Sequence, residues 1–234
     1  MPRRLTLVIP SLATFSSLIF GVLAIMVLAD GNFLLAAMLI LLGSILDVLD
    51  GQLAARLNAI SDIGKELDSL ADMITFGVAP TLLVYHLLLL VGVDQFVAMV
   101  ISMGFVIGGA YRLARFNTRP GDRGGYFKGL PIPMASALVI AGSFWQHWQV
   151  NIWWTVLVIS ASYLMVSPFP YPKSTRVLSL PGWFWGLMVL LVGISWAIVG
   201  WQGVPFGLFL MYAAIGPLLL IFKSTYKRLR RNEE

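Results

Sequence analysis

Apolar segments, each long enough to cross a lipid bilayer as a helix, follow one another along almost the whole chain. A helical span needs about 20 mostly apolar residues. Eight segments approach this length, at about 5–28, 33–56, 65–91, 95–116, 131–147, 152–167, 181–199 and 204–223. Only 12% of the 234 residues are charged, which is about half the share in an average soluble domain. We therefore expect an all-α integral membrane protein, a polytopic bundle of about eight transmembrane helices.

The boundary between the fifth and sixth segments is weak, because both are short and residues 149–151 separate them only loosely. A bundle of seven spans is therefore the alternative. The spans leave no room for a separate soluble domain of ordinary size. We accordingly expect a single transmembrane domain over residues 1–234.

The positive charges favour the arrangement with eight spans. With that number both termini lie on one side of the membrane, and all sixteen Lys and Arg residues fall on that side. Because short cytoplasmic loops are enriched in Lys and Arg, we expect both termini in the cytoplasm, in a multi-pass protein of the cell (inner) membrane. The basic tail, residues 223–234, fits anchoring at an anionic lipid surface.

Four aspartates occur inside the second and third apolar segments, where charge is costly: Asp47, Asp50, Asp68 and Asp72. A carboxylate in the bilayer core costs roughly 2.5–3.5 kcal/mol on insertion scales unless it is paired or binds a metal. Each pair is one helical turn apart and therefore shares a helix face. Two antiparallel helices joined by a short loop would bring all four to a similar depth, near the cytoplasmic face.

Four carboxylates in one small volume need cations to offset their charge. The chain has no cysteine and only two histidines, which excludes thiolate sites and multi-histidine metal centres. Oxygen ligands favour hard divalent ions such as Mg²⁺, Mn²⁺ or Ca²⁺, and two such ions would neutralise the site. Metal pairs promote displacement at phosphorus. Gly51 and Gly64 leave room for a ligand, and the free amides that follow Gly64 favour phosphate.

The spacing of these residues resembles a family motif. The run reads Asp47-x2-Asp50-Gly51-x2-Ala54-x9-Gly64-x3-Asp68-x3-Asp72. It is similar to the motif of the CDP-alcohol phosphatidyltransferases, Asp-x2-Asp-Gly-x2-Ala-Arg-x8-Gly-x3-Asp-x3-Asp. Residues 67–72, 76–80, 112–117 and 126–133 further resemble the phosphatidylserine synthase branch. The resemblance covers about residues 8–140, and the last three spans match only in hydrophobicity and placement.

The resemblance implies transfer of a phosphatidyl group from CDP-diacylglycerol to L-serine, with release of CMP. It implies that the four aspartates hold two Mg²⁺ or Mn²⁺ ions, which bind the diphosphate and stabilise the leaving CMP. Asp72 would also take the proton of the serine hydroxyl. The residues expected to bind the nucleotide of the donor are Gly51, Ala54, Arg56 and Gly64. One position differs from the motif, because Ala55 stands where the family has arginine.

The acceptor serine carries a carboxylate, so its site needs a cation. Arg112 and Arg115 lie at the cytoplasmic end of the fourth span, and arginine binds a carboxylate through two parallel hydrogen bonds. Asn117 and Lys128 are further candidates for the same pocket. The alternative role of these residues is to fix the topology and contact lipid phosphate.

Several alternatives stay open. One alternative is another acceptor, namely inositol phosphate, glycerol phosphate or choline. A second is an ether-lipid donor. The four aspartates serve all of these reactions. A carboxylate-based cation transporter is a different class, but transporters bind ions near the bilayer midplane in repeated halves, and this chain shows no repeat. A third hypothesis is a catalytically impaired homologue, because of Ala55. Members of the family are often homodimers, and we expect a homodimer here.

Overall fold

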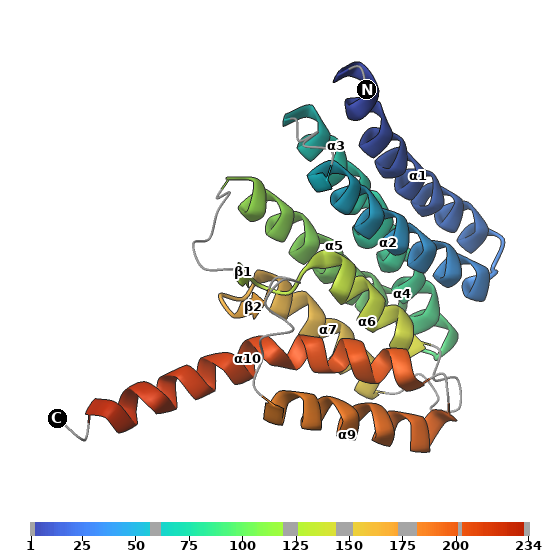
Figure 1. Ribbon diagram of the computed structural model, residues 1–234. Coiled ribbons are helices and arrows are strands. Elements are labelled where there is room, and N and C mark those ends of the chain that lie inside the picture. The colour runs from blue at the N-terminus through green and yellow to red at the C-terminus, as the bar shows by residue number, and fades with distance from the viewer. Residues whose placement is uncertain are drawn as a thin grey trace. The chain divides into compact units, whose positions relative to one another are not determined.

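The computed structural model describes residues 3–56, 62–118, 126–143, 152–172, 182–200 and 203–231. Almost all of this part of the chain is helical (Figure 1). The helices are α1 (Arg3–Ala29), α2 (Phe33–Arg56), α3 (Asp62–Asp72), the π-helical segment η1 (Met73–Val78), α4 (Ala79–Leu90), α5 (Gln95–Thr118), α6 (Ile132–Ser143), α7 (Ile152–Val166), α9 (Gly182–Val199) and α10 (Gly203–Arg231). Since α3, η1 and α4 follow without a break, the described residues form eight continuous helices, one for each predicted segment, and the all-α prediction is confirmed.

Two of the helical stretches in the described part of the chain are long and apolar enough to cross a membrane. They are Ile63–Leu90, with 28 residues, and Gln95–Thr118, with 24. The shorter apolar helical stretches found there are Thr14–Ala29, Phe33–Val48, Ile132–Ser143, Ile152–Val166, Met188–Ala197 and Gly203–Leu219.

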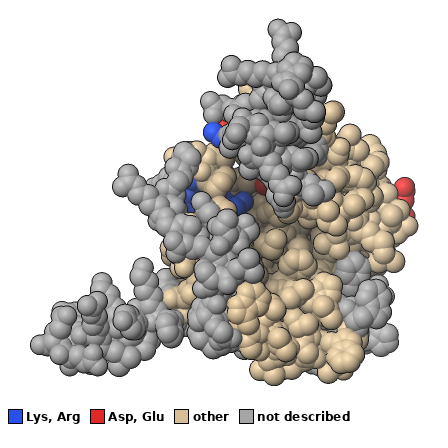
Figure 2. Space-filling view, viewed as in Figure 1, with Lys and Arg blue, Asp and Glu red and all other residues tan. Residues whose placement is uncertain are grey.

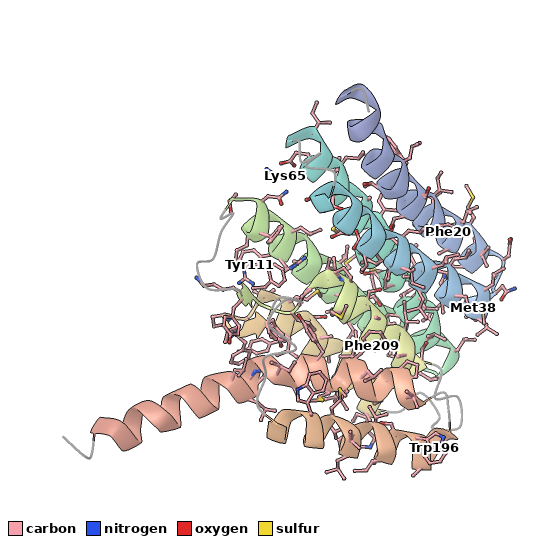
Figure 3. The ribbon with its side chains drawn as sticks, in the orientation of Figure 1. Phe20, Met38, Lys65, Tyr111, Trp196 and Phe209 are labelled. Atoms are coloured by element: carbon pink, nitrogen blue, oxygen red, sulfur yellow. The ribbon has the colours of Figure 1, made fainter. Side chains whose placement is uncertain are left out.

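The outward faces of the helices carry large apolar side chains. On α1, Leu12 is 59% exposed, Ile19 55% and Met26 60%. These residues are seven positions apart, about two turns, so they form one stripe roughly 21 Å long at about 1.5 Å per residue. Met38 on α2 and Trp196 on α9, labelled in Figure 3, are exposed as well. In the face shown in Figure 2 most of the described surface is uncharged. Apolar stripes of this length are typical of a surface that faces lipid, which supports a membrane protein.

The chain divides into two compact units, Met1–Leu113 and Ala114–Glu234. In the first unit α1 and α2 pack along each other, and α3, η1 and α4 pack against them (Figure 1). Its core includes the fully buried residues Ile40, Phe76 and Leu83. Gly21 on α1 and Gly43 on α2 both lie against Thr75 of η1. Glycines at such contacts allow the backbones to approach closely, as is usual where helices pack in lipid.

In the second unit α10 packs against α6 and α9, and α6 packs against α7. Two short strands, β1 (Tyr126–Lys128) and β2 (Pro170–Pro172), pair antiparallel with Phe127 opposite Tyr171. Tyr171 is fully buried and donates a hydrogen bond of 2.9 Å from its hydroxyl to the carbonyl of Ala213. The strand pair therefore joins the segment before α6 to the segment after α7. The hydrogen bond from Tyr171 attaches this strand pair to α10. Both strands lie between the predicted apolar segments, and their pairing was not predicted from the sequence.

Candidate metal centre

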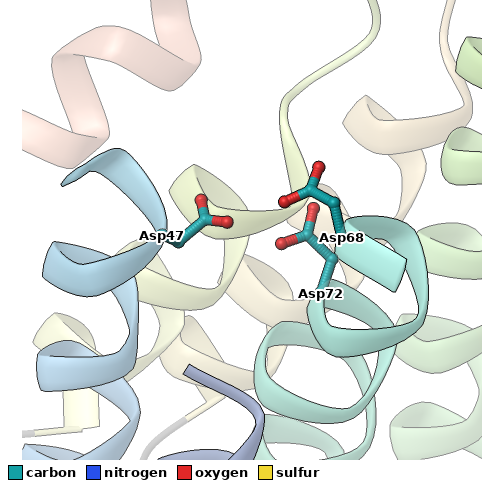
Figure 4. Close-up of side chains that lie close together, drawn as sticks. All are labelled: Asp47, Asp68 and Asp72. Atoms are coloured by element: carbon teal, nitrogen blue, oxygen red, sulfur yellow. The ribbon is translucent and has the colours of Figure 1, made fainter. Parts of the chain in front are cut away.

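Three of the four predicted aspartates come together in the first unit. Asp47 extends from α2, and Asp68 and Asp72 extend from α3, with all three side chains pointing toward one another (Figure 4). One carboxylate oxygen from each residue lies within 4.8 Å of the others. Asp68 and Asp72 are four residues apart in a helix, and this spacing puts them on one face. The predicted clustering is therefore confirmed for these three residues.

The fourth aspartate, Asp50, lies in α2 one turn after Asp47. Its side chain falls outside the part of the structure that is described, as do the side chains of Gly51, Ala54 and Arg56 in the last turns of the same helix. Their predicted roles therefore stay predictions.

Burial distinguishes the three clustered aspartates. Asp72 is only 8% exposed, whereas Asp47 and Asp68 are half-buried. The three carboxyl groups lie close enough together for Asp47 and Asp68 to act on the charge of Asp72. Ionised carboxylates approach one another this closely only when a proton or a cation lies between them. The cluster thus has the properties of a cation site.

Arg112 supplies a positive charge beside this cluster. It extends from α5, belongs to the same unit, is 8% exposed, and acts electrostatically on both Asp68 and Asp72. If the three clustered carboxylates are ionised, Arg112 offsets one negative charge and two remain. The remaining charge equals that of one divalent ion. From the sequence we expected Arg112 to bind the carboxylate of the acceptor serine, and this role stays a prediction.

The donor set fits a hard divalent cation. All three ligands are carboxylates, which Mg²⁺, Mn²⁺ and Ca²⁺ prefer. Bonds of about 2.0–2.6 Å place two oxygens on the same ion no more than about 4–5 Å apart, and the observed oxygens lie within 4.8 Å of one another. Small adjustments of the side chains would complete the coordination, so the residues present suit a metal of the predicted type.

Gly64 lies slightly differently from the expectation. The sequence pattern placed it just before the first turn of the third span, but α3 begins at Asp62, so Gly64 is the third residue of the helix. Gly64 is half-buried. Its backbone amide is still among the first four of the helix. Phosphate binding at this end of the helix therefore stays a prediction.

The other predicted acceptor residues, Arg115, Asn117 and Lys128, belong to the second unit. Asn117 is half-buried in the last turns of α5, and Lys128 is exposed at the end of β1. The guanidinium of Arg115 donates hydrogen bonds to the backbone carbonyls of Lys128, Met165 and Val166. This structural role was not predicted from the sequence. The residue that signals it is Gly129, whose φ is 78° and whose added Cβ would collide with the Arg115 guanidinium and the Met165 carbonyl.

Comparisons with known proteins agree with this site. A family model described as CDP-alcohol phosphatidyltransferase matches residues 7–166. A Bacillus subtilis protein named CDP-diacylglycerol--serine O-phosphatidyltransferase is 38% identical over 164 residues, which cover 70% of this chain and 89% of that protein. A Helicobacter pylori protein of the same name is 35% identical over 243 residues, covering 97% of this chain and 98% of the relative. A Methanothermobacter thermautotrophicus protein named archaetidylserine synthase is 34% identical over 168 residues, 70% of each chain. With a family match over more than half of its length and relatives aligned along nearly all of it, this chain belongs to the CDP-alcohol phosphatidyltransferase family.

Proposed function

We propose that this protein transfers the phosphatidyl group of CDP-diacylglycerol to L-serine and releases CMP, giving phosphatidylserine for phospholipid biosynthesis. The observation that carries the proposal is the cluster of Asp47, Asp68 and Asp72, in a chain whose relatives are named for this reaction. A phosphotransferase of this type needs hard, negatively charged ligands where a diphosphate has to be bound, and the cluster supplies them.

Asp47, Asp50, Asp68 and Asp72 would hold the metal, and we propose Mg²⁺ or Mn²⁺, with two ions when all four residues take part. When bound, the metal supplies electrostatic stabilisation of the diphosphate and of the negative charge on the departing CMP. Arg112 would neutralise part of the carboxylate charge and so reduce the repulsion between the aspartates when no metal is bound.

Asp72 is our candidate for the general base. Its carboxylate would accept the proton of the serine hydroxyl as the hydroxyl oxygen forms a bond to the lipid-bearing phosphorus. The bond from that phosphorus to the CMP oxygen breaks, and CMP leaves with the electron pair. The burial of Asp72 keeps water away from the proton acceptor, which favours transfer to serine over hydrolysis.

Substrate positioning falls to cations and small residues around the cluster. Arg112 would bind the serine carboxylate, because it is the cation beside Asp68 and Asp72 in the first unit. Arg115, Asn117 and Lys128 remain further candidates. Nucleotide contacts would come from Gly51, Ala54, Arg56 and Gly64, which lie at the facing ends of α2 and α3.

We further propose that the eight helices all span the membrane and that the whole chain forms one domain. Both termini would lie in the cytoplasm, and the active site would open to the cytoplasmic side of the cell (inner) membrane. The apolar stripes on the helices and the one-sided distribution of Lys and Arg support this topology. The family match runs across the boundary between the two compact units, which supports a single domain. We propose a homodimer by analogy with the family.

Two alternatives concern the substrates. Another alcohol acceptor would use the same carboxylates, but the Bacillus, Helicobacter and Methanothermobacter relatives are all named for serine transfer. An ether-linked donor is supported by the likeness to archaetidylserine synthase. A cation transporter lacks support, because these relatives are transferases.

The deciding experiment measures CMP release by the purified protein from CDP-diacylglycerol, with and without L-serine. We expect release that requires both serine and Mn²⁺ or Mg²⁺. Parallel reactions with inositol phosphate, glycerol phosphate and choline serve as controls for the acceptor, and an ether-linked CDP-lipid tests the donor. Turnover with one of these alcohols and none with serine would overturn the proposal.

A further inference from the structure

One helical turn away from the carboxylate cluster, three helices meet at the side chain of Thr75. Thr75 lies in η1, three residues after Asp72, and is fully buried. Gly43 lies in α2, four residues before Asp47. The contact between Thr75 and Gly43 is therefore the next contact along the two helices that carry the metal ligands.

Two hydrogen bonds link this contact to α1. The hydroxyl of Thr75 donates a bond of 3.0 Å to the backbone carbonyl of Ser17. The hydroxyl of Ser17 in turn donates a bond of 3.2 Å to the backbone carbonyl of Gly43. Both donors are buried. Side-chain hydrogen bonds between helices in an apolar environment hold the helices in one relative position, so α1 connects η1 to α2.

The packing around Thr75 leaves no space for larger side chains. A Cβ added to Gly43 would lie 2.8 Å from the methyl carbon Cγ2 of Thr75. A Cβ added to Gly21 on α1 would lie 2.5 Å from the Thr75 hydroxyl oxygen and 2.8 Å from its Cα. Gly21 on α1 and Gly43 on α2 thus form a notch between the two helices, and the side chain of Thr75 from η1 fills it.

Thr75 enters this notch from the π-helical turn. The amide of Ala79 donates to the carbonyl of Ile74, five residues earlier, which widens the turn. Three consecutive residues of η1, Thr75, Phe76 and Gly77, are buried.

We propose that Thr75 is a positioning residue for the metal site. Held between Gly21 and Gly43 and bonded to Ser17, it sets the separation of α2 and α3 and thereby the distance from Asp47 to Asp68 and Asp72. Metal ligands tolerate displacements of only about 0.2 Å, and a packed helix transmits a shift over one turn. The inference rests on the proposed function only for its activity readout, because metal binding is measured separately.

The first test is Gly43→Ala in the purified full-length protein. The readout is the binding of Mn²⁺ alone, followed by electron paramagnetic resonance of the free ion, without lipid or serine. We expect at least about 10-fold weaker Mn²⁺ binding, the loss typical for residues that orient metal ligands. The Mn²⁺ concentration for half-maximal CMP release should rise in parallel, while KM for serine at saturating Mn²⁺ stays near the wild-type value. Gly104→Ala is the matched control, since a Cβ added there meets no atom within 4 Å.

A second-site change distinguishes positioning from general damage. Thr75→Ser removes Cγ2 and keeps the hydroxyl, so it should restore Mn²⁺ binding to Gly43→Ala. It should fail to restore Gly21→Ala, because that clash involves the hydroxyl oxygen and Cα, which serine retains. Restoration of both variants or of neither would overturn the proposal, as would wild-type Mn²⁺ binding by Gly43→Ala.

If Gly43→Ala does not fold, Thr75→Val decides the question. Valine keeps the shape and removes only the donor to Ser17, so we expect a folded protein with several-fold weaker Mn²⁺ binding. Wild-type Mn²⁺ binding by this variant would overturn the proposal. A different outcome separates the two proposals. If the variants change Mn²⁺ binding as expected but the wild-type protein transfers no phosphatidyl group to serine, the proposed function is overturned and the positioning role of Thr75 stands.

Discussion

The Nη2 atom of Arg115 donates a hydrogen bond of 2.6 Å to the backbone carbonyl of Lys128. Nη2 also reaches the carbonyl of Met165 at 3.1 Å, and Nη1 reaches that of Val166 at 2.8 Å. One guanidinium therefore joins the end of α5 to β1, which precedes α6, and to the last two residues of α7. The planar fork of arginine is suited to several acceptors at once, whereas lysine presents a single point charge.

We expect Arg115→Lys to reduce stability by about 2 kcal/mol, because bonds from a charged donor contribute about 1.5–3 kcal/mol each. That loss corresponds to a decrease in Tm of roughly 4–8 °C for a chain of this size, measured by thermal unfolding in detergent. KM for serine should change little. A large rise in KM at unchanged Tm would contradict the structural role and favour the acceptor role predicted from the sequence.

Replacement of the clustered carboxylates should abolish turnover. Asp47→Asn, Asp68→Asn and Asp72→Asn each remove a charged ligand, and we expect CMP release to fall by at least about 100-fold. High Mn²⁺ should partly restore Asp47→Asn but not Asp72→Asn, because the latter also loses the proposed base. Asp94→Asn is the control: Asp94 accepts the amides of Phe96 and Val97 at the start of α5, and asparagine can do the same. Full activity of Asp72→Asn would exclude the base role.

Removal of divalent ions should stop the reaction and also lower stability. Since a metal that binds only the folded state stabilises it by about 2.7 kcal/mol at 100 times its Kd, we expect Mn²⁺ to raise Tm and EDTA to reverse the increase. The same titration of the Asp68→Asn variant should show a much smaller shift. Equal shifts in both proteins would place the metal elsewhere.

Gly129 should tolerate a side chain far less than Gly31. Both have a positive φ, 78° and 75°, so alanine costs about 1–2 kcal/mol in backbone conformation at either site. At Gly129 the new Cβ would also meet the Arg115 guanidinium and the Met165 carbonyl, whereas at Gly31 it meets no atom within 4 Å. We therefore expect a clearly larger loss of Tm for Gly129→Ala. Equal losses of Tm at the two positions would show that the Arg115 guanidinium is not held rigidly against Gly129.

Ala55 offers a test of donor binding. Because the family motif has arginine at this position, we expect Ala55→Arg to lower KM for CDP-diacylglycerol through an added contact with phosphate or nucleotide. The measurement is CMP release at saturating serine, with Ala55→Lys as a second cation. An unchanged KM would mean that Arg56 or another cation already fills the role.

The helices and the carboxylate cluster were predictable because both depend on local spacing. The expected segment 33–56 coincides with α2 (Phe33–Arg56), since apolar length alone defines such a helix. Aspartates four residues apart share a helix face wherever the helix lies, so the pairing of Asp68 with Asp72 needed no tertiary information. The last helix was harder to bound: α10 continues to Arg231, past the predicted end at 223, because a polar helix can extend beyond an apolar segment.

Features that depend on distant contacts were missed. Strand β2 (Pro170–Pro172) contains two prolines, which normally disfavour strands, and only its pairing with Tyr126–Lys128 makes it one. The role of Arg115 was missed for a similar reason: its acceptors are backbone carbonyls, which leave no trace in residue type. The wide turn of η1 was likewise not predicted, because its hydrogen bond from the Ala79 amide to the Ile74 carbonyl is made by backbone groups.

This wide turn also takes up one residue of the chain's length. A π-helical turn holds about one residue more than a regular turn, so deleting a single residue from Met73–Val78 would restore a regular helix and leave α4 facing much as it does now. Winding all the residues of this segment into a regular helix would instead rotate α4 by about 100° relative to α3, and the apolar residues that follow would face the wrong neighbours. Related sequences should therefore tolerate the loss of one residue here better than at other positions of the same continuous helix.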